Sequence, residues 1–313
     1  MTHTYKLPDL LHPKINSVFS SLCRVGVLFA VGLVLLSDGA YAFIGSTSFS
    51  RFTAFRRIHA ISAEQDAVAQ HPPMPSTVKG ILFDMDGTLT DSDSLHFEAY
   101  RETFLKVTPD FNGGTPITND YYDEWMSGNS NAAIVEKLFP DKLKEEQTAL
   151  WKSKEELYRN ISTKMTPLPG LLAFLDRCRR AGLAMIIVTN APRLDAEHTM
   201  QVLDLYNRQD VSEIGQGVSF GKTMVIGCEC ARAKPHPDPY LEGLSRLGLK
   251  AEDCVAFEDS VNGATSAVSA GLYTIGVGEG AGEKLRGVGV EMAVANFLDS
   301  RLSCTLGLGG SED

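Results

Sequence analysis

The stretch KGILFDMDGTLTDSD, residues 79–93, joins a short apolar run to an acidic loop. The run Lys79–Phe83 has no polar alternation, which is typical of a strand buried on both faces of a parallel sheet. In an open parallel sheet, ligands bind beyond the carboxyl ends of the strands. Asp84 and Asp86, which follow this run directly, are therefore the first candidates for chemistry.

The rest of the chain alternates between strand-like and helix-like segments. We expect strands at 184–188, 224–227, 255–257 and 273–277, and helices at 171–181, 193–205, 239–247 and 261–270. This order predicts an α/β fold with a doubly wound, parallel-sheet (Rossmann-like) core.

Between the first two strands, residues 94–107 and 119–163 show helical spacing with few β-branched residues. They predict an inserted all-helical cap domain. We place the core at 79–94 and 166–300, the cap at 95–165 and a flexible tail at 301–313.

Composition excludes several classes of protein. The chain has 313 residues, 43% of them hydrophobic and 22% charged, which excludes a disordered chain and a multi-span membrane protein. A net charge of −10 argues against a nucleic-acid-binding surface. Six cysteines at irregular spacing do not indicate a small disulfide framework.

The first 78 residues differ from the rest in charge, with six basic and four acidic side chains. An apolar run of 12 residues, Val25–Leu36, follows Arg24 and precedes Ala40 and Ala42. This layout predicts a signal peptide over 1–42, cleaved after Ala42, with an uncleaved anchor as the alternative.

Residues 43–78 predict a second targeting segment and a linker, because Phe43–Ser62 contains three arginines and no acid. The pair resembles the bipartite presequence of algae with complex plastids, where a Phe follows an alanine-rich cleavage motif. This resemblance implies a plastid (stroma) location. A secreted or endomembrane protein is the alternative.

Further polar residues follow the other expected strands. Thr189-Asn190, Lys234 and Glu258-Asp259 would join Asp84 and Asp86 at one edge of the sheet. Crowded carboxylates repel one another unless a cation lies among them. All-oxygen ligands favour Mg²⁺, and no His or Cys at these strand ends supports zinc.

The same edge could hold a phosphate. Lys234 supplies positive charge and Thr189 supplies a hydroxyl. A helix is expected to begin beside Pro192, so the backbone N–H groups near Asn190 and Ala191 would point outward at its positive end. Taken singly, each of these residues could be a turn, a helix cap or a solvated loop side chain. The prediction depends on their occurring together.

Four motifs carry a family resemblance. FDMDGTLTDSD (83–93), VTN (188–190), KPHPDPY (234–240) and FEDSVNG (257–263) resemble, in order, the signature motifs of the haloacid dehalogenase-like hydrolase superfamily. The resemblance covers about residues 79–296, and the helical insertion is similar to that superfamily's cap. KLFPD (137–141), KEELYR (154–159) and VTNAP (188–192) further resemble the beta-phosphoglucomutase-like branch, especially plant broad-range sugar phosphatases.

The resemblance implies a mechanism. Asp84 would attack phosphorus and become a phosphoaspartate, and Asp86 would protonate the leaving alcohol and then deprotonate water. Mg²⁺ would be held by Asp84, the carbonyl of Asp86, and Asp259, with help from Glu258.

The resemblance also implies substrate contacts. Thr189, Asn190 and Lys234 would bind the phosphoryl group, and His96 and Lys154 would reach the rest of the substrate. His96 could instead be a packing residue. Lys154 could instead be an exposed helix lysine paired with Glu155 or Glu156.

One departure separates the chain from the mutases of this branch. Their cap carries a Gly-x-Ser-Arg pattern that grips a second phosphate, whereas this chain reads Gly128-Asn129-Ser130-Asn131. Asn131 cannot make a bidentate charged grip, which favours hydrolysis.

We therefore expect a Mg²⁺-dependent phosphatase of small phosphate monoesters, first of all sugar phosphates. The alternatives are beta-phosphoglucomutase, an isomerase, and a catalytically silent binding protein on the same scaffold. The expected partner is a small phosphorylated metabolite, with no nucleic acid, no stable membrane anchor in the mature protein, and a monomeric state. We expect Cys228 and Cys230 to be buried free thiols, with a redox switch as the alternative.

Overall fold

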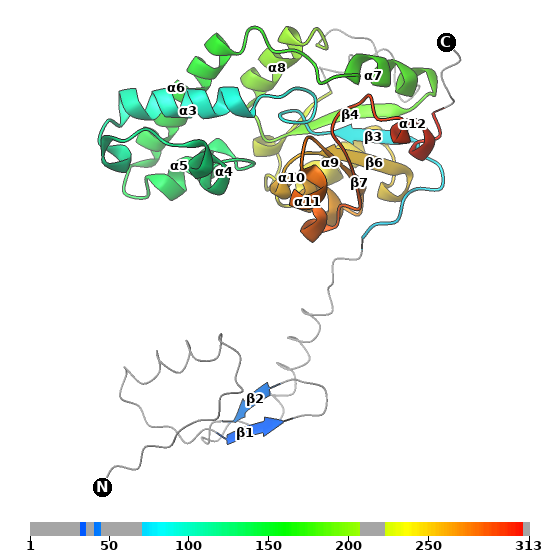
Figure 1. Cartoon of the computed structure of the whole chain (residues 1–313), viewed down its shortest axis with the longest axis horizontal. Coiled ribbons are helices and arrows are strands. Elements are labelled where there is room, and N and C mark those ends of the chain that lie inside the picture. The colour runs from blue at the N-terminus through cyan, green and yellow to red at the C-terminus, as the bar shows by residue number, and fades with distance from the viewer. Residues whose placement is uncertain (1–31, 36–40, 45–70, 207–222, 309–313) are drawn as a thin grey trace. The chain divides into compact units, whose positions relative to one another are not determined.

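A computed structural model describes residues 32–35, 41–44, 71–206 and 223–308 (Figure 1). The chain forms two units, residues 1–68 and 69–313. In the first unit, β1 (Gly32–Leu35) and β2 (Tyr41–Ile44) pair antiparallel. Apart from β1, β2 and residues 71–78, the expected targeting segments lie outside the described residues. No described helix has the length and apolar character needed to cross a membrane.

The second unit is built on a six-stranded parallel sheet with strand order β5-β4-β3-β6-β7-β8. The strands are β3 (Gly80–Phe83), β4 (Ala184–Thr189), β5 (Val225–Ile226), β6 (Cys254–Glu258), β7 (Tyr273–Val277) and β8 (Met292–Val294). The chain leaves β3 toward β4 and β5 on one side, and returns to place β6 on the other side. This reversal of strand order beside β3 is where open α/β sheets bind ligands.

Helices cover both faces of the sheet (Figure 1). They are α7 (Leu171–Arg180), α8 (Arg193–Val202), α9 (Asp238–Leu247), α10 (Val261–Ser269), α11 (Ala281–Lys284) and α12 (Arg301–Thr305). In β3, Phe83 packs in the hydrophobic cluster that contains α7, α8 and α12 side chains, and Leu82 packs in the cluster of α9 and α10. The buried strands and the helices on both faces confirm the expected α/β fold.

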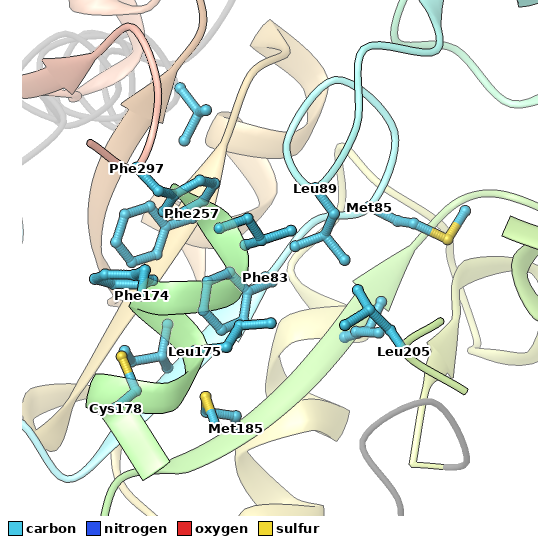
Figure 2. Close-up of a cluster of buried hydrophobic side chains, with 14 of the residues drawn as sticks. Phe83, Met85, Leu89, Phe174, Leu175, Cys178, Met185, Leu205, Phe257 and Phe297 are labelled. Carbon is cyan, nitrogen blue, oxygen red and sulfur yellow. The ribbon is translucent and has the colours of Figure 1, made fainter. Parts of the chain in front are cut away.

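Four phenylalanines lie at the centre of the first cluster (Figure 2). The ring of Phe83 stacks on that of Phe257 at 5.3 Å between centroids, and Phe174 and Phe297 pack against both. Because β3 and β6 are anchored here, the residues that follow them are held on a rigid base.

The insertion after β3 is all-helical, as expected. It contains α3 (Asp93–Val107), α4 (Asn119–Trp125), α5 (Asn131–Leu138) and α6 (Lys144–Ile161). These helices share a hydrophobic cluster of their own, with Tyr100, Phe104, Ile134 and Leu150 buried in it. The expected continuous helical block is divided at Gly128, whose φ of +71° suits only a glycine, and again before α6.

The C-terminal segment differs from the expected flexible tail. Residues 301–308 include helix α12, and Leu302, Leu306 and Leu308 are buried in the core cluster. The prediction of flexibility was wrong here because three leucines in so short a segment supply a buried face without a long periodic pattern. Strand β8 was also not predicted, because its three residues are too few to show a hydrophobic pattern.

Candidate active site

The strand ends bring the predicted acidic residues together around one lysine. Lys234, in the loop between β5 and α9, is 6% exposed. Its Nζ lies 2.7 Å from Asp84 Oδ1 and 2.6 Å from Glu258 Oε1, and it also donates to the carbonyl oxygen of Val188 at 2.7 Å. The ammonium is therefore held at one point by three oxygen acceptors.

Glu258 is the most enclosed of these groups. It is fully buried, and the hydroxyl of Tyr240 on α9 donates to its Oε1 at 2.6 Å. A Cβ at Gly263 would collide with the Glu258 carboxylate, and a Cβ at Gly87, where φ is +75°, would collide with that of Asp259. The glycines of the motifs DMDG and SVNG are thus required by the close approach of backbone to carboxylate.

The three carboxylates of the site repel one another. Burial and the charge of Glu258 raise the pKa of Asp84 to about 7, although Lys234 opposes the shift. Burial, together with the charges of Asp84 and Glu258, raises the pKa of Asp259 well above its ordinary value. One ammonium does not balance three carboxylates, so this cluster could hold a further cation.

The donor set fits a hard divalent ion. Oxygens of Asp84, Glu258 and Asp259 lie within 4.8 Å of one another and could serve as ligands to one ion. Carboxylate oxygen is the ligand type that Mg²⁺ prefers. These residues therefore fit the magnesium ion that the sequence predicts.

Asp86 belongs to a separate hydrogen-bonded group. Its Oδ1 accepts from Ser92 Oγ at 2.8 Å and lies 3.3 Å from His96 Nε2, whose ring stacks on Tyr158 at 4.1 Å. Burial alone would raise the pKa of Asp86, yet the contacts with His96 and Ser92 hold it below its ordinary value. The carboxyl is thus held in one orientation at the pocket.

Lys154 on α6 contacts His96 on α3, the residue that contacts Asp86. It is 1% exposed, and its Nζ lies 2.8 Å from His96 Nδ1 and 2.9 Å from a Glu155 oxygen. It also lies 4.6 Å from the ring centre of Tyr100. The alternative of an exposed lysine was therefore wrong, although its expected pairing with Glu155 is present.

A pocket of about 100 Å³ lies between core and cap side chains. Predicted residues that line it are Asp84, Asp86, Thr189, Asn190, Lys234, Asp259, His96 and Lys154. Glu258 is absent from the lining and lies behind Lys234. The structure thus brings the predicted residues to one place, with Glu258 in a supporting position.

Several groups that hold the site in shape were not predicted from the sequence. Ser92 and Tyr240 contact predicted residues directly, and Tyr158 stacks on His96. A signal for Tyr158 was available, because it lies four residues after Lys154 on the same face of α6. Ser92 and Tyr240 lie within the quoted motifs, but nothing in their spacing indicates their partners.

The expected phosphate cradle is only partly formed. The N–H of Ala191 donates to Thr189 Oγ1 at 2.9 Å and so does not face a ligand. The amide of Asn190 bonds to the backbone of Lys234, accepting from its N–H at 3.2 Å. Pro192 precedes the first residue of α8 as its N-cap. The physical reason is local, because a threonine hydroxyl at a strand end can accept a hydrogen bond from a nearby backbone N–H.

The two cysteines after β5 also differ from expectation. Both are free thiols, as expected, but Cys228 is exposed and Cys230 only half-buried. Cys228 lies in the 3₁₀ turn Gly227–Glu229 and Cys230 is its C-cap, so both follow the end of β5 and lie outside the buried strand.

The chain is similar in sequence to a protein family and to several known proteins. The family model for haloacid dehalogenase-like hydrolase matches residues 78–271. The protein CbbY of Rhodobacter capsulatus is 30% identical over 213 residues, which cover 63% of this chain and 84% of CbbY. Hexitol phosphatase A of Escherichia coli is 30% identical over 208 residues, covering 64% of this chain and 82% of the relative.

A solved structure shares the fold. The beta-phosphoglucomutase of Clostridium difficile has a TM-score of 0.58 and 19% identity, and the match covers 74% of this chain and 98% of that one.

Proposed function

The chain belongs to the haloacid dehalogenase-like hydrolase family and is a phosphatase of that family; we propose that it hydrolyses small phosphate monoesters, first of all sugar phosphates. The observation that carries this proposal is the Asp84 carboxylate, held 2.7 Å from the buried Lys234 ammonium at the floor of the pocket. The phosphatase named above, which is 30% identical, supports the substrate class.

We propose that Asp84 is the nucleophile. A carboxylate oxygen of Asp84 would form a bond to phosphorus as the bond from phosphorus to the leaving alcohol breaks. Lys234 would offset the negative charge of the phosphoryl group as it approaches the carboxylates, and the Thr189 hydroxyl would bind one of its oxygens. Phosphate monoesters are so inert that rate enhancements of up to ~10²¹ occur, so a preorganised cation beside the nucleophile is needed.

Asp86 would move the proton in both halves of the reaction. It would donate a proton to the departing alkoxide, and then accept one from the water that hydrolyses the phosphoaspartate. Ser92 and His96 hold the carboxyl that would do this. Asp84, Asp259, Glu258 and the carbonyl of Asp86 would hold Mg²⁺, which when bound would neutralise charge on the transferring phosphoryl group.

The cap would exclude water and contact the organic part of the substrate. His96 and Lys154 line the pocket from α3 and α6, where His96 contacts Asp86 and Lys154 contacts His96. Closing a pocket of this kind strengthens the electrostatic contacts inside it and prevents side reactions of the intermediate.

Substitution of the nucleophile tests the proposal. Asp84→Asn should lower phosphate release from p-nitrophenyl phosphate by at least about a thousandfold, because an amide cannot form the covalent intermediate. Chelation of divalent metal should abolish activity, and added Mg²⁺ should restore it. Unchanged release by Asp84→Asn would overturn the nucleophile, and no release by the wild type would favour the silent scaffold.

The mutase alternative is tested separately. With beta-glucose 1-phosphate and a bisphosphate activator, the hydrolase should release free phosphate. Glucose 6-phosphate forming without free phosphate would instead show an isomerase. Asn131, whose amide is engaged by Tyr100 and Glu155, supports hydrolysis because it offers no cation for a second phosphate.

We also propose a plastid location. The basic, acid-poor segment after residue 42 supports it. A fusion of residues 1–78 to a fluorescent protein should label plastids, and label in the culture medium would contradict the proposal.

A further inference from the structure

Glu155 carries an oxygen that the mechanism does not use. Its side chain is 4% exposed and lines the cap side of the pocket. Oε1 accepts from Lys154 Nζ at 2.9 Å and from Asn131 Nδ2 at 2.5 Å. Oε2 is buried and has no hydrogen-bond partner among the residues that the structure describes. A buried carboxylate oxygen without a donor is costly, so a donor from a ligand in this pocket would relieve it.

The charges around Glu155 specify what that donor can be. Among the residues that line the pocket, only Lys154 and Lys234 are lysine or arginine. Lys154 is engaged by Glu155 and His96, and Lys234 by two carboxylates of the core. Neither lysine is left to balance a second phosphate at the cap end.

Asn131 is engaged on both sides of its amide. Its Nδ2 donates to Glu155, and its Oδ1 accepts from the Tyr100 hydroxyl at 2.6 Å. The cap end therefore presents a carboxylate acceptor beside an amide whose oxygen and one N–H are already engaged. Such a group attracts hydroxyls and repels phosphate.

We propose that Glu155 Oε2 accepts a hydrogen bond from a hydroxyl of the alcohol that leaves, and that it thereby selects polyhydroxylated monophosphates. Substrates with a second phosphate, and alkyl phosphates without hydroxyls, are disfavoured at this position. The inference rests on the proposed phosphatase function, because it concerns the organic half of that substrate. A site with a buried polar group rejects an analogue that leaves the group unpaired.

A purely structural role for Glu155 makes a different prediction. As a counterion of Lys154 it would need only Oε1, and its loss would affect all substrates alike. Selection by Oε2 depends instead on the hydroxyls of the substrate. The two roles are therefore distinguished by the ratio of kcat/KM values between substrates and not by the rate with any one substrate.

Wild-type protein is the first test. Its kcat/KM for a hexitol 6-phosphate should exceed those for n-hexyl phosphate and for a hexitol 1,6-bisphosphate by about 10- to 100-fold, as expected for a hydrogen bond to a charged group. Equal values for the hexitol phosphate and the hexyl phosphate would overturn the subsite while leaving the phosphatase intact. Failure to hydrolyse all of these compounds and p-nitrophenyl phosphate would instead overturn the proposed function.

The variant Glu155→Gln is the second test. It nearly preserves shape but removes the charge and one acceptor. The fall in kcat/KM should be at least about tenfold larger for the hexitol 6-phosphate than for p-nitrophenyl phosphate, mainly through KM, and the bisphosphate should gain relative to the monophosphate. Glu156→Gln, at the next and exposed position of α6, is the matched control. It should leave unchanged the kcat/KM of the hexitol 6-phosphate relative to p-nitrophenyl phosphate and relative to the bisphosphate.

Equal losses on all substrates with Glu155→Gln would overturn the selection role and support the counterion role. The thermal unfolding of the variant shows whether it is folded. If it is not folded, the wild-type comparison of hexitol and hexyl phosphates still decides the proposal.

Discussion

The core end and the cap end of the pocket each bury a lysine, but the two lysines are held in different ways. Lys234 is bound by carboxylates that lie 150 and 24 residues away in sequence, at the ends of β3 and β6. Lys154 is bound by its own neighbour Glu155 and by His96 of α3. The core lysine therefore depends on the sheet being assembled, whereas the cap lysine depends mostly on α6 and its packing against α3.

The core end and the cap end of the pocket therefore differ in the groups that they contribute to the site. The core end is crowded with carboxylates and holds the groups assigned to the phosphoryl transfer. The cap end places one carboxylate and one amide on helices that have a hydrophobic cluster of their own. Changes at the core end should therefore alter stability and chemistry together, and changes at the cap end should alter selectivity first.

The largest expected effect comes from removing each lysine in turn. Lys234→Met leaves Asp84 and Glu258 buried without their cation and should lower the free energy of unfolding by about 3–5 kcal/mol. Lys154→Met leaves only Glu155 without its cation, so it should lower the free energy of unfolding by less. Urea unfolding without added metal measures the free energy of unfolding of both variants. A larger loss for Lys154→Met than for Lys234→Met would contradict the difference between the two ends of the pocket.

A smaller effect is expected from two matched tyrosines. Tyr240 and Tyr100 are both fully buried, and each donates a hydrogen bond of 2.6 Å, to the Glu258 carboxylate and the Asn131 amide respectively. Tyr240→Phe should cost about 1.5–3 kcal/mol, and Tyr100→Phe about 0.5–1.5 kcal/mol, because bonds to charged groups are stronger. Equal losses in urea unfolding would show that the charge at the core end does not matter to stability.

The smallest effect concerns pH. The pKa of Asp86 is held below its ordinary value, so this carboxyl stabilises the fold above its unfolded pKa, and the contribution is lost as pH falls through the lowered folded value. Ser92→Ala removes one of the bonds responsible and should raise that pKa, at a cost of about 1 kcal/mol at pH 7.

Unfolding of both proteins across pH measures this effect. The difference between wild type and Ser92→Ala should shrink as the pH is lowered through the depressed pKa of Asp86, because this carboxyl then becomes protonated in both proteins. A difference that stays constant with pH would show that Ser92 acts by packing and not through the carboxyl.

Much of the core could be predicted because its signals are local and repeated. The apolar run of β3 and the polar residues after it indicate a buried parallel strand and a ligand edge without any tertiary information. The signals for β8 and α12 were too short, and their burial depends on a surface supplied by the rest of the domain.

The candidate site was predicted unevenly for a similar reason. Asp84 and Lys234 were expected at the same edge of the sheet, and the structure places their charged atoms 2.7 Å apart. The engagement of Ala191 by Thr189, and the support of Glu258 by Tyr240, depend on side-chain directions that the sequence does not specify. The cap could be recognised as helical, but not which of its polar residues would be buried.

By itself, the sequence determined the parallel sheet, the helical insertion and the edge at which carboxylates and a lysine gather, because hydrophobic period and strand order are properties of the chain. Only the tertiary structure decided that Lys154 is buried, that Glu258 lies behind the pocket and that Glu155 keeps one oxygen without a partner. Those facts depend on how separate helices and strands pack, and burial and hydrogen bonding exist only once they have done so.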